Sequence, residues 1–305
     1  MLRVGSFIWR RREAVNPATI LKLVLLLGVV MLVVAIGIRA RLEEPLLLLR
    51  RPALALRAMV AMYVVLPAFV LVLVWLVPLQ EGVGAVLLGF AVSPVLPPWA
   101  KKGAAVGGQS DYVIGLQVLS SGVALLVVPL MIWIAYRIFG VATALDPLAV
   151  EVVLLVTVAA PLAVGMGLAR LYPGAAPRLA ALADRVGGVV LLLGAVVLLI
   201  VHGRAILGVI GQGTLVVTVA VVAFGRLVGH LLGGPDPGNR GALASATVSR
   251  HPAIALLLAS GAFPEHEATV IGTVLLYLLA ALLLAVPYER WRKQVARAQP
   301  HVTNP

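Results

Sequence analysis

Nine apolar segments, separated by short connections, constrain this chain more than any other feature of its sequence. A helix needs about 20 apolar residues to cross the hydrocarbon core of a bilayer. Alternating apolar and polar residues, which are typical of a membrane β-barrel strand, do not occur, so we expect an all-α polytopic membrane protein with about nine transmembrane helices. The segments are 18–38, 53–77, 83–100, 112–139, 148–171, 186–202, 208–232, 242–263 and 268–288.

Composition agrees with this prediction. Hydrophobic residues make up 62% of the 305 residues and charged residues only 12%, whereas a soluble domain carries about a quarter charged residues. The net charge is +12, but Lys and Arg lie mostly between the apolar segments, which is typical of membrane topology signals and not of nucleic-acid binding. The absence of cysteine excludes disulfides, Cys-ligated zinc and Fe–S clusters.

The distribution of basic residues predicts an orientation. If the C-terminus is cytoplasmic, the inner loops carry most of the Lys and Arg residues, so we expect a multi-pass protein of the plasma (inner) membrane with its N-terminus outside. The basic run Arg10-Arg11-Arg12 argues for the opposite orientation. We expect basic tails at 1–17 and 291–305 to flank two repeats, at 18–140 and 148–290.

The third and eighth segments differ from the others because proline interrupts them. The third contains Pro94, Pro97 and Pro98 within five residues, and each interior proline costs a helix about 3 kcal/mol. The eighth places an Arg-His pair ahead of Pro252. Both segments therefore predict a broken helix.

Aligning Val92-Ser93 with Val248-Ser249 matches segments two to four with segments seven to nine. The eighth segment comes five steps after the third, an odd number, so the two broken helices enter the membrane in opposite senses. Such an inverted pair indicates the binding site of a secondary transporter.

Glycine turns, proline-marked helices and a Ser-Pro break recur along the chain, namely Ala35-Ile36-Gly37-Ile38, Arg50-Arg51-Pro52, Pro67, Ser93-Pro94, and Gly107-Gly108-Gln109-Ser110-Asp111 leading to Pro129. The order and spacing of these motifs over about residues 20–290 resemble the bile acid:sodium symporter family. This resemblance implies inverted repeats, a core domain around two crossing broken helices, and a panel domain formed by segments one, five and six.

The second broken helix departs from the family pattern. Sodium-coupled members carry a Glu, a Gly and a Gln-Asn pair where this chain has Thr247, Ser249, His251 and Pro252, so no carboxylate remains. In the helix after the first break, the family's hydroxyl ligands fall on Gly115, Leu119 and Val123, with Ser120 and Ser121 nearby. Hard cations prefer several oxygen ligands, so we do not expect sodium coupling, although a rebuilt sodium site is an alternative.

Arg250 and His251 are the most informative candidates. Arg250 either supplies a fixed positive charge that binds an anion or is a structural cation held by free carbonyls, and an arginine in mid-membrane favours the first reading. His251 either couples transport to protons or is a neutral donor to the backbone. The full set of predicted substrate- or ion-binding residues is Ser93, Pro94, Pro97, Pro98, Ser120, Ser121, Thr247, Ser249, Arg250, His251 and Pro252.

These residues predict a secondary carrier of a small organic anion that works by alternating access without a cofactor. A sodium symporter and a non-transporting membrane sensor of the same fold are alternatives. An enzyme is not expected, because H-E-x-x-H, G-x-S-x-G and a pair of intramembrane aspartates are all missing. The histidines lack metal-ligand spacing, so no metal site is predicted, and the expected partners are the substrate and the lipid bilayer.

Overall fold

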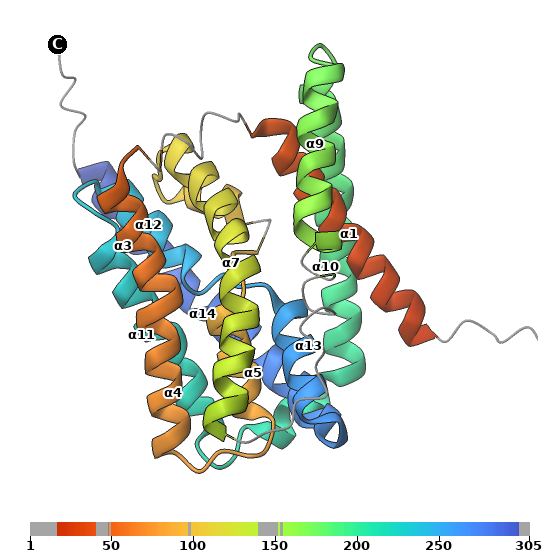
Figure 1. Ribbon diagram of the computed structural model, residues 1–305, viewed down its shortest axis with the longest axis vertical. Helices are drawn as coiled ribbons and strands as arrows, with labels where there is room; N and C mark the ends of the chain where they lie inside the picture. Colours follow the sequence, from red (N-terminus) through yellow and green to blue (C-terminus); the bar gives the residue numbers. More distant parts are fainter. Residues whose placement is uncertain are drawn as a thin grey trace, which may run out of the picture.

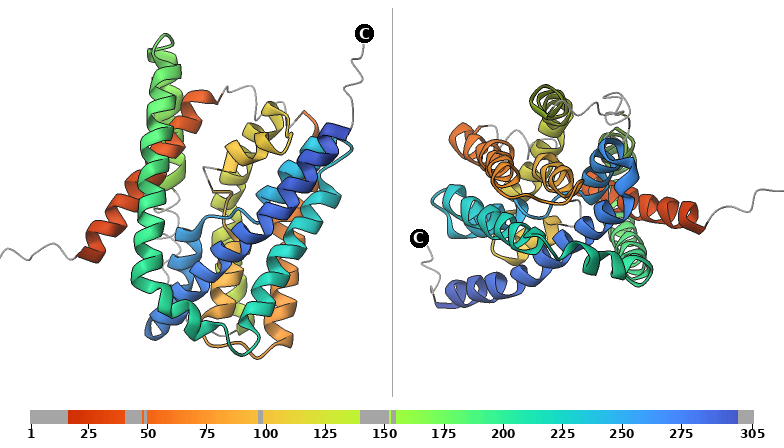
Figure 2. Two further views of the ribbon diagram at one scale, coloured as in Figure 1. Left: turned by 180° about the vertical axis from the view of Figure 1, so that it is seen from behind. Right: turned by 90° about the horizontal axis from the view of Figure 1, so that it is seen from below.

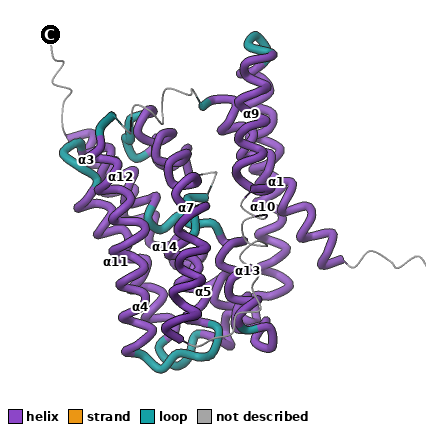
Figure 3. The backbone as a smooth tube through the Cα atoms, in the orientation of Figure 1, coloured by secondary structure: helices purple, strands orange, loops and turns teal. Residues whose placement is uncertain are grey.

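The computed structural model describes residues 17–40, 48, 50–96, 99–139, 152 and 155–298. All the named elements of this part of the chain are helical, which confirms an all-α protein (Figure 3). The basic run at Arg10 to Arg12 and the candidates Pro97 and Pro98 lie outside the described residues.

The helices occur in the order shown in Figure 1. They are α1 (Pro17–Arg39), α3 (Pro52–Val60), η1 (Ala61–Val65), α4 (Leu66–Leu76), α5 (Val83–Val92), α6 (Trp99–Ala105), α7 (Ser110–Phe139), η2 (Leu155–Ala159), α9 (Ala160–Leu171), α10 (Ala176–Val209), α11 (Thr214–Leu232), α12 (Pro237–Ala246), α13 (Pro252–Ala262), η3 (Pro264–His266) and α14 (Glu267–Ala298).

The length and surface of these helices show a multi-pass membrane protein. Four described spans are long and apolar enough to cross a bilayer: Pro52–Leu76, Ala176–Val209, Thr214–Leu232 and Pro264–Arg292. Helix α10 leaves Leu192, Ile200 and Leu207 more than 60% exposed, which suits contact with lipid and not with water. Shorter apolar helices accompany these four, and the total of nine crossings stays a prediction.

Two predicted segment boundaries are wrong. Segment 186–202 is only the middle of α10, which begins at Ala176 and includes Asp184, whose carboxylate pairs with Arg39 of α1. Segment 208–232 begins too early, since α10 extends to Val209. Gln212 and Gly213, at φ of 50° and 83°, then turn the chain into α11.

Both predicted helix breaks are present. Helix α5 ends at Val92 and α6 begins at Trp99, while α12 ends at Ala246 and α13 begins at Pro252. We call residues 93–98 the first linker, of which 93–96 are described, and residues 247–251 the second linker. The two linkers meet in the middle of the molecule, a place that we call the crossing (Figure 3).

The halves of the two broken helices pack in opposite order. Helix α5 packs against α13, and α6 packs against α12, so the first half of each broken helix lies beside the second half of the other. The α5–α13 contact is close, because a Cβ on Gly89 would lie 2.8 Å from the Cα of Ala255. The chain therefore passes the crossing in opposite directions in its two passages.

The helices form two packed units (Figures 1 and 2). Helices α1, η2, α9 and α10 make the first, which we call the α1 unit, and α1 contacts the other helices of it. The remaining helices make the second, which we call the crossing unit because it contains both linkers. Contacts of α10 with α14 and of η2 with α7 join the two units.

Glycine allows the close approach of α1 and α9. A Cβ on Gly165 would lie 2.3 Å from the carbonyl oxygen of Val34 and 2.8 Å from the Cα of Gly37. These neighbours are backbone atoms, which cannot move aside without separating the helices. The α1 unit therefore depends on glycine at this contact.

We expect Gly165→Ala to lower the free energy of unfolding by about 1–3 kcal/mol, the usual cost of overpacking. The matched control is Gly167→Ala on the same helix, because no described atom lies within 4 Å of its Cβ position. Alanine there is expected to be neutral or to stabilise the helix by up to about 1 kcal/mol. Thermal unfolding in detergent measures both, and equal shifts would contradict the close α1–α9 contact.

Candidate functional site: the crossing of the two linkers

Backbone hydrogen bonds join the two linkers at the crossing. The amide of Leu96 donates to the carbonyl of Ser249 at 2.8 Å, and the amide of His251 donates to the carbonyl of Pro94 at 3.0 Å. Val95 and Arg250 thereby form an antiparallel bridge pair. Backbone groups freed by a helix break must find partners inside a membrane protein, and here each linker supplies them to the other.

Hydroxyl groups supply further backbone partners. The Ser93 hydroxyl donates to the carbonyl of Phe90 at 3.0 Å and accepts from the amide of His251 at 3.1 Å. Thr247 donates to the carbonyl of Gly225 on α11 at 2.6 Å. Both side chains are buried, so their hydroxyls hold the linkers in place.

Arg250 lies at the centre of the crossing and is only 1% exposed. Its Nη2 donates to the carbonyls of Met62 and Ala91, at 2.5 Å each, and its guanidinium lies 5.1 Å from the centre of the Tyr63 ring. Within the described part of the chain, its Nε and Nη1 have no hydrogen-bond partner. One arginine thus connects the second linker to η1 and α5.

The two carbonyls that accept from Arg250 are free for identifiable reasons. In η1, the amide of Leu66 donates to the carbonyl of Ala61, five residues earlier. With the same spacing, the carbonyl of Met62 would accept from the amide of residue 67. Residue 67 is proline and has no N–H, so the carbonyl of Met62 has no donor in its own helix. Ala91 lies in the last turn of α5, where carbonyls lack intrahelical donors.

His251 is also buried, with 1% of its surface exposed. Among the described residues, neither ring nitrogen has a hydrogen-bond partner, while its backbone amide is fully used by the first linker. Pro252 follows as the first residue of α13, a position where its missing N–H has no cost.

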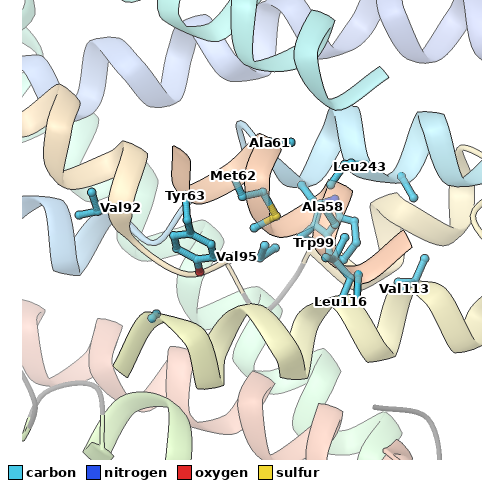
Figure 4. Close-up of a cluster of buried hydrophobic side chains, with 14 of the residues drawn as sticks. Ala58, Ala61, Met62, Tyr63, Val92, Val95, Trp99, Val113, Leu116 and Leu243 are labelled. Atoms are coloured by element: carbon cyan, nitrogen blue, oxygen red, sulfur yellow. The ribbon is translucent and has the colours of Figure 1, made fainter. Parts of the chain in front are cut away.

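Side chains from three neighbouring helices brace the crossing. Gln117 of α7 donates from Nε2 to the carbonyl of Val95 at 2.9 Å, and Tyr277 of α14 donates to the carbonyl of Val248 at 3.2 Å. The Tyr63 hydroxyl donates to the carbonyl of Ser120 at 2.7 Å. Figure 4 shows Met62, Tyr63 and Val95 gathered between the η1 helix and α7.

The structure brings most of the sequence-predicted residues together. Those in the linkers or at their ends meet at the crossing: Ser93, Pro94, Thr247, Ser249, Arg250, His251 and Pro252. Ser120 and Ser121 lie in α7, where both hydroxyls donate to the carbonyl of Gln117 at 3.0 and 2.9 Å. That any of these residues binds a ligand stays a prediction.

Sequence reasoning missed Gln117 and the tyrosines. Gln117 was detectable, because it is the one amide side chain in the apolar segment 112–139. Tyr63 and Tyr277 carry no comparable signal, since tyrosine is common in membrane helices.

The charges at the crossing favour an anion. Neither linker contains Asp or Glu, and Arg250 is the residue there that always carries a charge. In the described part of the chain, no group of three or more His, Asp or Glu side chains is placed to hold a metal ion. Helix α13 starts at the crossing with the positive end of its dipole, while α5 and α12 end there with their negative ends, so the anion preference rests on Arg250.

Comparison with known families agrees with this architecture. The model of the Sodium Bile acid symporter family matches residues 24–210. The chain belongs to the sodium bile acid symporter family. The matched range includes α1, the first broken helix and α10, and it ends before α11. The sequence-based family prediction is therefore confirmed.

No individual curated protein matches the chain. Family membership identifies a transporter of the bile acid symporter type, which favours transport over catalysis.

Proposed function

We propose that this protein is a sodium-independent carrier of small organic anions and that the guanidinium of Arg250 takes the place of a coupling cation. The position of Arg250 carries this proposal. Its Nη2 bonds two carbonyl oxygens that a proline and a helix end leave free. Carbonyl oxygens in this arrangement would otherwise suit a bound hard cation.

A mid-membrane arginine costs about 2.5–3.5 kcal/mol on insertion scales, and such residues usually serve function. Here its charge lies beside the positive N-terminus of α13 and also beside the last turns of α5 and α12, whose negative ends it more than offsets because it is a full charge. A carboxylate approaching the crossing would meet this combined field. Because the positive charge belongs to the chain itself, anion binding does not require sodium.

The arrangement of helices supports alternating access. Each proposed repeat, 18–140 and 148–290, contains a long span, a broken helix and another long helix, and the broken helices pack in opposite order. We infer that the crossing unit is the core and the α1 unit the panel, between which the substrate passes. The exposed Arg51, Arg57 and Arg240, in or beside α3 and α12, suit a cytoplasmic face.

Three alternatives make different predictions. A rebuilt sodium site would use carbonyls and hydroxyls at the crossing, whereas proton coupling would use His251, whose ring nitrogens have no partner among the described residues. A non-transporting sensor would bind the anion without moving it. The ion dependence of transport and the presence of solute flux distinguish the sodium-independent carrier from these three alternatives.

We expect thermal stability of the purified protein to be the same in sodium and potassium at fixed ionic strength. A ligand at about 100 times its dissociation constant stabilises a folded protein by roughly 2.7 kcal/mol, so an occupied sodium site is readily visible as a shift in Tm. A saturable, sodium-specific shift would overturn sodium independence and favour the rebuilt site.

Counterflow in proteoliposomes tests transport itself. Vesicles loaded with an unlabelled short-chain carboxylate are expected to accumulate the labelled acid equally well with sodium or potassium outside. Stimulation by an inward proton gradient would instead point to His251. Binding without flux would identify a sensor and overturn the carrier proposal.

A further inference from the structure

A small cavity lies where the two units meet beside the crossing. It has a volume of about 10 Å³, enough for about one water molecule. Its polar lining comes from Gln117 and Ser121 of α7, and the rest of its described lining is aliphatic, with Val33 from α1 and Val158 from η2 among these residues. Because the two units face each other here, motion between them would enlarge this cavity.

Both polar lining residues keep hydrogen-bond acceptor capacity that no described residue uses. Gln117 is 3% exposed, and its Nε2 donates to the carbonyl of Val95, which fixes the orientation of its amide. Its Oε1 has no partner within the described residues. Ser121 uses its hydroxyl proton for the carbonyl of Gln117 at 2.9 Å, so its oxygen retains only lone pairs for a ligand.

A buried acceptor without a donor is costly, and a ligand that supplies the donor removes that cost. A ligand hydroxyl or amide N–H meets this requirement, whereas a carboxylate does not because it is itself an acceptor. The aliphatic lining suits an adjacent hydrocarbon group.

We propose that Gln117 and Ser121 select organic anions that carry a hydroxyl or amide N–H donor next to a short aliphatic group. This inference rests on the proposed function and names its substrate class. A site built around a hydrogen-bond donor of its ligand rejects the analogue that lacks it. The preference is expected to be about 10- to 100-fold in dissociation constant.

Matched acids test the proposal. The probes are 2-hydroxy-3-methylbutanoate against 3-methylbutanoate, and 2-hydroxybutanoate against butanoate, measured by thermal shift and by competition in counterflow. The wild-type protein is expected to bind each hydroxy acid at least about tenfold more tightly. Gln117→Leu and Ser121→Ala are expected to bring the ratio for each pair close to one.

Thr273→Val is the matched control. Thr273 is a buried helix residue of α14 whose hydroxyl donates to a carbonyl four residues earlier at 2.8 Å, as that of Ser121 does, but it is not among the cavity-lining residues. It should keep the wild-type ratio. The ratio of the two dissociation constants does not depend on the fraction of folded protein. A destabilised Gln117→Leu variant therefore still gives a usable value.

The outcomes separate the two proposals. If the acids of each pair bind equally to the wild type, the donor requirement is wrong and the anion carrier stands. Survival of the preference in both Gln117→Leu and Ser121→Ala also overturns the assignment. If no acid of either pair binds, the organic-anion function and this inference both fail.

Discussion

Replacing Arg250 by methionine is expected to reduce organic-anion counterflow about 10- to 100-fold. The substitution keeps a long side chain and removes the charge, so a carboxylate at the crossing loses its charge-assisted hydrogen bonds, which contribute about 1.5–3 kcal/mol. The carbonyls of Met62 and Ala91 lose their donor at the same time. Initial counterflow rates in proteoliposomes measure the effect.

The stability of Arg250→Met should change much less than its transport. Two unpaired buried carbonyls cost about 1–3 kcal/mol each, but removing an arginine from mid-membrane saves about 2.5–3.5 kcal/mol. These contributions oppose each other and nearly cancel. We therefore expect a folded variant with little transport, which thermal unfolding in detergent can establish.

Arg226→Met is the matched control. Arg226 is another buried arginine, 7% exposed, but its side chain contacts α14, since it donates from Nη2 to the carbonyl of Ala281 and lies over Tyr288. It should keep counterflow. If Arg250 takes the place of a cation, Arg250→Met should also gain a sodium-specific increase in Tm that the wild type lacks. Wild-type counterflow in Arg250→Met would contradict the role of its charge.

The broken helices could be predicted from sequence because proline acts locally. Pro94 and Pro252 each remove a backbone donor at a known position, so the breaks at residues 93 and 247–251 follow without knowledge of the fold. Apolar length similarly identified the long spans. Helix α10 is longer than predicted because apolar length alone does not mark where a helix continues into polar residues, and the partner of Asp184, Arg39, lies on a second helix that no local pattern reveals.

The partners of Arg250 could not be predicted for the same reason. Its position at membrane depth indicated a special role, but its acceptors, Met62 and Ala91, lie 188 and 159 residues away in the chain. Pro67 was visible as a helix irregularity, yet the carbonyl that it frees matters only because the second linker passes beside it. Chemistry at this crossing arises from tertiary contacts between residues that look ordinary in sequence.

A cross-link between the two units is expected to abolish transport completely and reversibly. The chain has no native cysteine, so an introduced pair is the sole target of a thiol reagent. Val118 of α7 and Val158 of η2 line the same small cavity from opposite units. In Val118→Cys/Val158→Cys, a short bifunctional thiol-reactive reagent with a reducible link should stop counterflow, and reduction should restore it, because the proposed mechanism requires the crossing unit to move against the α1 unit.

The control pair lies within one unit. Ile36 of α1 and Leu162 of α9 line the same cavity, and both belong to the α1 unit. Cross-linked Ile36→Cys/Leu162→Cys should retain the counterflow rate of its own reduced form, since these helices are expected to move together. Comparing each protein before and after reduction cancels any effect of the substitutions on binding. Unchanged counterflow in the cross-linked Val118/Val158 pair would rule out relative motion at this contact.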